Sequence, residues 1–245
     1  MYDPIDSEQY QMENKSPEPI RTPKIDCVLY DVGRQSYQET LKLQLQLHSD
    51  CREGRISGAV VAVEHNAVIT LGAKTAPGNL LVSRQLLERQ GIELIQTDRG
   101  GDITYHGPGQ LVAYPILNLK ELGNDVHAHL RLMEESIIIT LKEFGLKGRR
   151  HGNAGVWVGE RKICSIGVAV RKWVTYHGLA LNISPNMNHF TLINPCGYSS
   201  DRMISLAGLL QPCPAFDRVK QVVLDSIAQV FDINLILHEQ VGVKE

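Results

Sequence analysis

The chain of 245 residues contains 43% hydrophobic and 21% charged residues and carries a formal net charge of −2. This length allows one large domain or two small ones, and the near-neutral charge does not indicate a surface for nucleic acid or an anionic membrane. Five cysteines without C-x-x-C spacing argue against a disulfide framework or a zinc knuckle and favour a reducing cytoplasm.

The N-terminal segment, residues 1–24, is rich in proline and polar residues and shows no hydrophobic period. Such a segment buries too little apolar surface to offset the entropy of ordering, so we predict a flexible tail. It lacks the apolar centre of a signal peptide and the arginine-rich character of a transit peptide, which agrees with a cytoplasmic location. We expect one folded domain over residues 25–245.

The domain is predicted to begin with a strand and a helix. The strand covers residues 27–30, and Ser36 with Glu39 forms a capping box for a helix that runs to about residue 52. The residues that recur at helical spacing in this helix are Leu41, Leu45 and His48.

Hydrophobic runs at residues 59–64 and 68–72 predict two strands with a turn at His65–Asn66 between them. Further along, Ser83 can cap a short helix that Gly91 ends.

Two longer helices are predicted in the second half. Asp125 can cap the first of them, and Gly145 ends it. Its apolar residues repeat at steps of three and four: Val126, Leu130, Met133, Ile137, Leu141 and Phe144. The last helix covers about residues 214–231, with an inward face of Phe216, Val219, Val223, Ile227 and Val230.

Three strands are predicted between these helices. Residues 156–158 and 162–170 meet across a tight turn at Gly159–Glu160, and residues 174–183 form the third strand. Helices would flank a mostly antiparallel sheet, so we predict an α+β fold.

A glycine-rich segment stands out between residues 99 and 114. It reads Arg99-Gly100-Gly101-Asp102-Ile103-Thr104-Tyr105-His106-Gly107-Pro108-Gly109-Gln110-Leu111-Val112-Ala113-Tyr114. Glycines let a ligand approach the main chain closely. The segment is neither a phosphate-binding loop with a Lys-Ser/Thr ending nor a dinucleotide fingerprint. Its composition alone leaves two interpretations open, a turn between two strands or a ligand-binding loop.

This segment resembles the signature of the lipoyl(octanoyl) transferases. Three further segments resemble that family in the same order, namely Gly159–Val168, which contains Lys162, Tyr176–Asn182, and Asn194–Gly197, which contains Cys196. The match extends from about residue 27 to residue 232, and four motifs in register are far more specific than any one of them.

The resemblance implies a biotin/lipoate protein ligase fold and an acyltransferase activity. Such an enzyme takes octanoyl from octanoyl-acyl carrier protein, holds it as a thioester on Cys196, and passes it to a lysine. The acceptor is a lipoyl domain of a 2-oxoacid dehydrogenase or the glycine-cleavage H protein, and the reaction is the first step of endogenous protein lipoylation. We expect the enzyme to be a monomer that needs no cofactor or metal. We also expect that it binds neither nucleic acid nor a membrane.

The chemistry is consistent in its energetics. Exchange between thioesters is nearly balanced, and making an amide from a thioester runs downhill, so no ATP is needed. A free thiol, with a pKa of ~8.5, needs a nearby cation or base to react at neutral pH. Lys162 can supply either, although a lysine beside an arginine on a strand usually lies on a solvated face, and only the resemblance favours a catalytic role. Its proximity to Cys196 is implied by the resemblance.

The resemblance also assigns the acyl pocket, where small residues and backbone amides suit a straight chain and an oxyanion. The residues are Arg99, Gly100, Gly101, Asp102, Ile103, Thr104, Tyr105 and His106, then Ser165, Ile166 and Gly167, and finally His177, Gly178, Leu179 and Ala180. We expect His106 and His177 to shape the pocket. Strand alternation predicts that Lys162, Cys164 and Ile166 share a face, and we interpret Cys164 as a packing residue.

Three alternatives remain open at this stage. The first is an ATP-dependent lipoate or biotin ligase of the same fold, which has no nucleophilic cysteine. The second is an amidotransferase that moves octanoyl between carrier domains, with its cysteine elsewhere in the chain. The third is an inactive module that binds an acyl chain or a carrier domain. Pro195-Cys196-Gly197 counts against the first two, and the presence of both Lys162 and Cys196 counts against the third.

Overall fold

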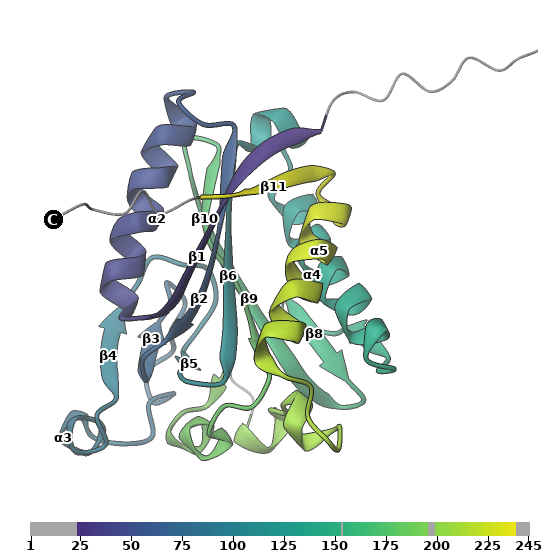
Figure 1. Cartoon of the computed structure of the whole chain (residues 1–245). Coiled ribbons are helices and arrows are strands. Elements are labelled where there is room, and N and C mark those ends of the chain that lie inside the picture. Colours follow the sequence, from purple (N-terminus) through teal and green to yellow (C-terminus); the bar gives the residue numbers. More distant parts are fainter. Residues whose placement is uncertain (1–23, 153, 196–198, 239–245) are drawn as a thin grey trace, which may run out of the picture.

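The computed structural model describes residues 24–152, 154–195 and 199–238, and Figure 1 shows their arrangement. The predicted tail, apart from residue 24, lies outside them. Helices cover both faces of a large mixed sheet, so the domain has an α+β fold, as predicted. None of the helices in the described ranges is long and apolar enough to cross a bilayer.

The large sheet contains eight strands in the order β11-β1-β2-β6-β10-β9-β8-β7. Their bounds are β1 Ile25–Gln35, β2 Gly58–His65, β6 Gln110–Leu117, β7 Gly148–Arg150, β8 Gly155–Val158, β9 Arg161–Arg171, β10 Val174–Asn182 and β11 Ile233–Leu237. Strand β1 runs parallel to both of its neighbours, β11 and β2. The other pairs are antiparallel, which agrees with the predicted mostly antiparallel sheet.

A second sheet of three strands lies below α2 in Figure 1. Its strands are β4 Glu93–Gln96, β3 Val68–Leu71 and β5 Thr104–His106, with β3 in the centre. The chain does turn after β2 as predicted, but β3 enters this second sheet because β2 is already paired on both sides by β1 and β6.

The predicted helices are present with their caps. They are α2 Tyr37–Arg52, α3 Arg84–Arg89, α4 Val126–Glu143 and α5 Phe216–Val230. Ser36 and Glu39 form the full capping box of α2, and Ser83 and Asp125 accept backbone hydrogen bonds at the starts of α3 and α4. Short 3-10 turns complete the connections: η1 Leu119–Leu122, η2 Met187–Leu192, η4 Ser200–Arg202 and η5 Leu206–Gly208.

Helix α2 turns a partly polar face toward the sheet. Thr40 and Gln44 are completely buried with Leu47, whereas Leu45, one of the residues at helical spacing, is 47% exposed. The Gln44 side chain accepts a hydrogen bond of 2.8 Å from the backbone N–H of His177 on β10. This hydrogen bond satisfies the buried oxygen of Gln44 and ties α2 to β10.

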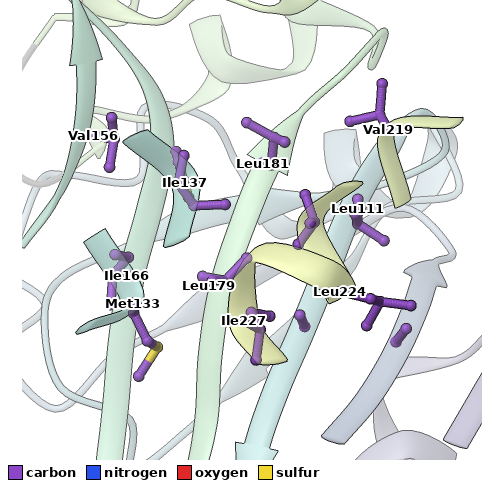
Figure 2. Close-up of a cluster of buried hydrophobic side chains, with 14 of the residues drawn as sticks. Leu111, Met133, Ile137, Val156, Ile166, Leu179, Leu181, Val219, Leu224 and Ile227 are labelled. Atoms are coloured by element: carbon purple, nitrogen blue, oxygen red, sulfur yellow. The ribbon is translucent and has the colours of Figure 1, made fainter. Parts of the chain in front are cut away.

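The main hydrophobic core lies between the other face of the sheet and helices α4 and α5. Met133 and Ile137 of α4 and Ile227 of α5 point toward Leu179 and the adjoining strands, as Figure 2 shows. Val112, Tyr114 and Ala180 face the opposite way and pack in a smaller cluster with α2. The alternation along β6 and β10 therefore leaves one set of side chains to the core and the other to the α2 side of the sheet.

Candidate active site

The centre of the site is a place where three backbone segments meet without side chains. Gly167 on β9 pairs with Gly178 on β10, and Gly100 lies against β9, where its N–H donates 2.8 Å to the carbonyl of Val168. A Cβ on Gly167 would lie 2.6 Å from the carbonyl oxygen of Gly100, and a Cβ on Gly178 would collide with the carbonyl of Ala113. Glycine is therefore required for this close approach.

These glycines border a narrow cavity of about 40 Å³, which we call the slot. Twelve of the residues that the sequence assigned to the acyl pocket line it: Arg99, Gly100, Gly101, Thr104, His106, Ser165, Ile166, Gly167, His177, Gly178, Leu179 and Ala180. Three more lining residues, Tyr37, Val112 and Tyr114, were not assigned from the sequence. Val112 and Tyr114 belong to the glycine-rich motif, but no local signal distinguishes Tyr37 from other residues in a first helical turn.

The remaining three assigned residues do not line the slot. Ile103 and Tyr105 are buried in a separate hydrophobic cluster with the second sheet. Asp102 accepts a hydrogen bond of 2.6 Å from the side chain of Asn79 and another from the backbone N–H of Ala76. These residues shape the loop that carries Gly100 and Gly101.

Arg99 brings a buried positive charge to the slot. Its side chain is held by Thr70. The hydroxyl of Thr70 accepts from Nε of Arg99 at 3.1 Å, and the backbone carbonyl of Thr70 accepts from a terminal nitrogen of Arg99 at 2.8 Å. A second terminal nitrogen donates to the carbonyl of Gly100 at 3.2 Å and lies beside Gly167. A guanidinium in this position can stabilise negative charge that develops on a carbonyl oxygen.

One part of the slot is polar but uncharged at neutral pH. Burial lowers the pKa of His106 to about 3, with His65 and Arg99 adding to the effect, and burial raises the pKa of Tyr37 to about 12. Burial likewise raises the pKa of Tyr114 well above its ordinary value. Two of these rings interact directly, since Tyr37 stacks on His106 at 6.3 Å between ring centroids.

His177 is fixed in one tautomer by its partners. Its Nε2 lies 2.9 Å from Asp98 Oδ1, and because a carboxylate only accepts, Nε2 carries the proton. Nδ1 then accepts from the hydroxyl of Tyr37 at 3.4 Å. Burial lowers the pKa of His177, although Asp98 opposes this effect. The backbone of His177 is left-handed, with φ of 59°, which is strained for a non-glycine residue and is a feature that clusters at functional sites.

Lys162 is buried at the start of β9, with 2% of its surface exposed. Its Nζ donates a hydrogen bond of 3.1 Å to the carbonyl of Ala154. Ala154 borders an outer cavity of about 430 Å³ that shares Gly100, Gly101, Ile166 and Gly167 with the slot. A buried lysine thus lies next to the border of a cavity that shares lining residues with the slot, rather than on a solvated strand face.

The predicted alternation along β9 is interrupted by a bulge. Cys164 pairs with Val156, whereas Lys162 pairs with the very next residue of β8, so Ile163 is the extra residue between them. Cys164 is completely buried with Ile166 in the main core, and it is absent from the lining of the slot. Burial raises the pKa of the Cys164 thiol to about 12. Both observations agree with a packing role.

Cys196, the predicted nucleophile, lies outside the described residues. On its N-terminal side, the N–H of Asn194 donates 2.8 Å to the carbonyl of Asn79, the residue that also holds Asp102. On its C-terminal side, the N–H of Ile204 donates 3.0 Å to the carbonyl of Lys162. The described flanks of Cys196 are therefore anchored to the glycine-rich loop and to the lysine strand.

Comparison with known proteins gives matches over most of the chain. The family model of the lipoyl protein ligase A/B catalytic domain matches residues 36–228. An octanoyltransferase of Solibacter usitatus is 42% identical over 212 residues, which cover 86% of this chain and 96% of that protein. An octanoyltransferase of Syntrophobacter fumaroxidans is 45% identical over 183 residues, covering 74% and 80% of the two chains.

Solved structures of the same fold have low sequence identity to this chain. A lipoate-protein ligase A bound with ATP superposes with a TM-score of 0.76 at 16% identity, covering 87% of this chain and 89% of that chain. A bipartite lipoate protein ligase from Thermoplasma acidophilum gives a TM-score of 0.68 at 16% identity, with 88% and 87% of the chains covered. At these identities the likeness shows the fold alone.

Proposed function

Because the chain belongs to the family of lipoyl protein ligase A/B catalytic domains, we propose that it is an octanoyltransferase of protein lipoylation. Its donor is octanoyl-acyl carrier protein, and its acceptors are lysines of lipoyl domains of 2-oxoacid dehydrogenases and of the glycine-cleavage H protein. The catalytic domain covers residues 25–245, the protein acts in the cytoplasm as a monomer, and residues 1–24 form a tail that takes no part in the chemistry.

The reaction has two steps, each of which forms one bond to the acyl carbon and breaks another. In the first step the Cys196 thiolate attacks the thioester carbonyl of the donor, and the carrier thiol leaves with a proton. In the second step the amine of the acceptor lysine attacks the acyl-cysteine, forms the amide and releases the Cys196 thiol. Lys162 stabilises the thiolate when protonated and accepts a proton when neutral.

The slot holds the acyl chain in this proposal. A straight alkyl chain would lie between the bare backbone segments, where each methylene that becomes buried contributes about 0.8 kcal/mol. In this proposal the buried charge of Arg99 stabilises the oxygen that becomes negative as the thioester is attacked.

One observation carries the proposal. A narrow slot lined by glycines shares four lining residues with an outer cavity whose border, at Ala154, is the hydrogen-bond partner of the buried Lys162. In this proposal the alkyl chain lies in the slot and its carbonyl end is directed toward the lysine. Lysine supplies the charge or the base that a thiol needs at neutral pH.

The proposal is tested by intact mass after incubation with octanoyl-acyl carrier protein, followed by peptide mapping. We expect one octanoyl group, and we expect it on Cys196. An adduct on any other residue would contradict the assignment of the nucleophile.

An ATP-dependent ligase is the second candidate, since a lipoate-protein ligase bound with ATP shares the fold. The two activities differ in their energy source. We expect octanoylation of a lipoyl domain from the thioester donor without nucleotide or magnesium, whereas a strict requirement for ATP would move the assignment to the ligase.

A further inference from the structure

The peptide group that joins Ala154 to Gly155 is hydrogen-bonded at both of its ends. Its carbonyl accepts from Nζ of Lys162 at 3.1 Å, and its N–H donates to Oε1 of Glu134 at 3.1 Å. The carbonyl and the N–H of one trans peptide point in opposite directions within its plane, so Glu134 and Lys162 lie at opposite edges of a single peptide group. This arrangement links a carboxylate on α4 to the lysine on β9.

Glu134 is built into the fold rather than placed on its surface. Its side chain is 3% exposed, and its second oxygen accepts from Arg131 at 2.7 Å and from Arg150 at 3.1 Å. The two arginine side chains are 64% and 37% exposed, so they reach the buried carboxylate from the solvent side. The two arginines hold one oxygen of the Glu134 carboxylate. The other oxygen points into the protein and accepts from the N–H of Gly155.

Gly155 is the position where the lysine side chain crosses the peptide. Its φ of 146° is rare for residues other than glycine, and a Cβ there would collide with Cε of Lys162 and lie 3.0 Å from Nζ. The lysine therefore lies directly over this peptide. Any rotation of the peptide moves the acceptor on which Nζ rests.

We propose that Glu134 is a positioning residue for Lys162 and acts through the Ala154–Gly155 peptide. A carboxylate that accepts the N–H polarises the peptide and makes its carbonyl a stronger acceptor for the lysine. The carboxylate also fixes the peptide plane, so that Nζ is held at one place beside the outer cavity. This inference rests on the proposed role of Lys162 in octanoyl transfer.

The test compares Glu134→Ala with Glu134→Gln in steady-state transfer of octanoyl from the donor to a lipoyl domain. Glu134→Ala leaves the peptide N–H without its acceptor, and we expect kcat to fall on the order of 10- to 100-fold, the range for a displaced catalytic group, with KM for the donor unchanged. Glutamine keeps one acceptor oxygen for the Gly155 N–H but places an NH2 donor against Arg131 and Arg150, so Glu134→Gln should recover kcat in part. Rescue by glutamine separates positioning from general destabilisation.

Glu135→Ala is the matched control, because Glu135 is the next residue on α4 and its partner is Arg150 at the surface. It should keep wild-type kcat. The inference is overturned if folded Glu134→Ala keeps wild-type kcat, if Glu134→Gln is as slow as Glu134→Ala, or if Glu135→Ala shows the same loss.

Lys162→Ala, measured in parallel, separates this inference from the proposed function. In the Lys162→Ala background, Glu134→Ala should not lower kcat further, because the lysine through which Glu134 acts is already absent. An additive loss would overturn the positioning role alone. Full activity of Lys162→Ala would instead refute the proposed role of the lysine.

Discussion

Replacing Gly167 with alanine adds one methyl group at the centre of the slot. The new Cβ would lie 2.6 Å from the carbonyl oxygen of Gly100, well short of the 3.4 Å at which ordinary contact begins. The obstacle is backbone, which cannot rotate away as a side chain would. Either the glycine-rich loop shifts outward or β9 bends, and the hydrogen bond between Gly100 and Val168 is strained in both cases.

The size of the effect follows from the cost of overpacking. An extra methyl in a tightly packed site costs about 1–3 kcal/mol, which corresponds to roughly 5- to 150-fold in kcat/KM when the cost falls on the complex with the acyl chain. We expect a loss in this range for octanoyl transfer by Gly167→Ala. The assay is the initial rate of lipoyl-domain octanoylation at several donor concentrations, together with thermal unfolding of the same samples.

Gly208→Ala is the matched control, because a Cβ there meets its nearest atoms at 3.5 to 3.9 Å, in ordinary contact and away from the slot. It should keep wild-type kcat/KM within about twofold, as a surface substitution without strain usually does. Wild-type kcat/KM and an unchanged melting temperature in Gly167→Ala would refute the close approach of the loop to β9. Equal losses in both variants would refute the assignment of the slot.

Three further predictions concern the thiols, the lysine and the histidines. Cys196→Ala should lose the octanoyl adduct in intact mass spectra, whereas Cys164→Ala should keep it, because burial raises the pKa of Cys164 to about 12 and keeps that thiol protonated. Lys162→Ala should slow both half-reactions in single-turnover assays, and Lys162→Arg should not fully restore them, since arginine cannot act as a base. Burial lowers the pKa of His106 to about 3 and that of His65 to about 4, both below the unfolded value of 6.5, so the unfolded chain binds protons first as the pH falls. The stability that these neutral histidines contribute is present above pH 6.5 and is lost toward pH 4. The free energy of unfolding should fall by about 1.4 kcal/mol per pH unit for each histidine. Urea unfolding at several pH values measures this slope, and His65→Phe should reduce it.

Local signals in the sequence correctly gave most helix boundaries. The capping box at Ser36, the caps at Ser83 and Asp125, and the turn between β8 and β9 all involve hydrogen bonds between residues a few positions apart. Because both partners of such a bond lie in one short segment, the residue types alone are sufficient to indicate it. The periodic apolar residues of α4, such as Met133 and Ile137, were predicted for the same reason.

Long-range pairing had no such signal. Strand β6 begins within the segment that composition left open between a turn and a ligand-binding loop, although it is buried along its whole length between β2 and β10. The assignment of β3 to the second sheet and the bulge at Ile163 likewise depend on partners that are distant in the chain or on the exact register of pairing. Strand pairing is decided by the whole fold, so single segments do not reveal it.

The sequence by itself determined the α+β class, the helix caps and, through four motifs, the residues to consider at the site. The tertiary structure decided how these residues meet: it placed Gly100, Gly167 and Gly178 side by side, added Tyr37 and Tyr114 to the slot, and removed Ile103 and Tyr105 from it. The physical reason is that side-chain identity limits which chemistry a residue can perform, whereas distance and burial arise only when segments far apart in the chain are packed against each other.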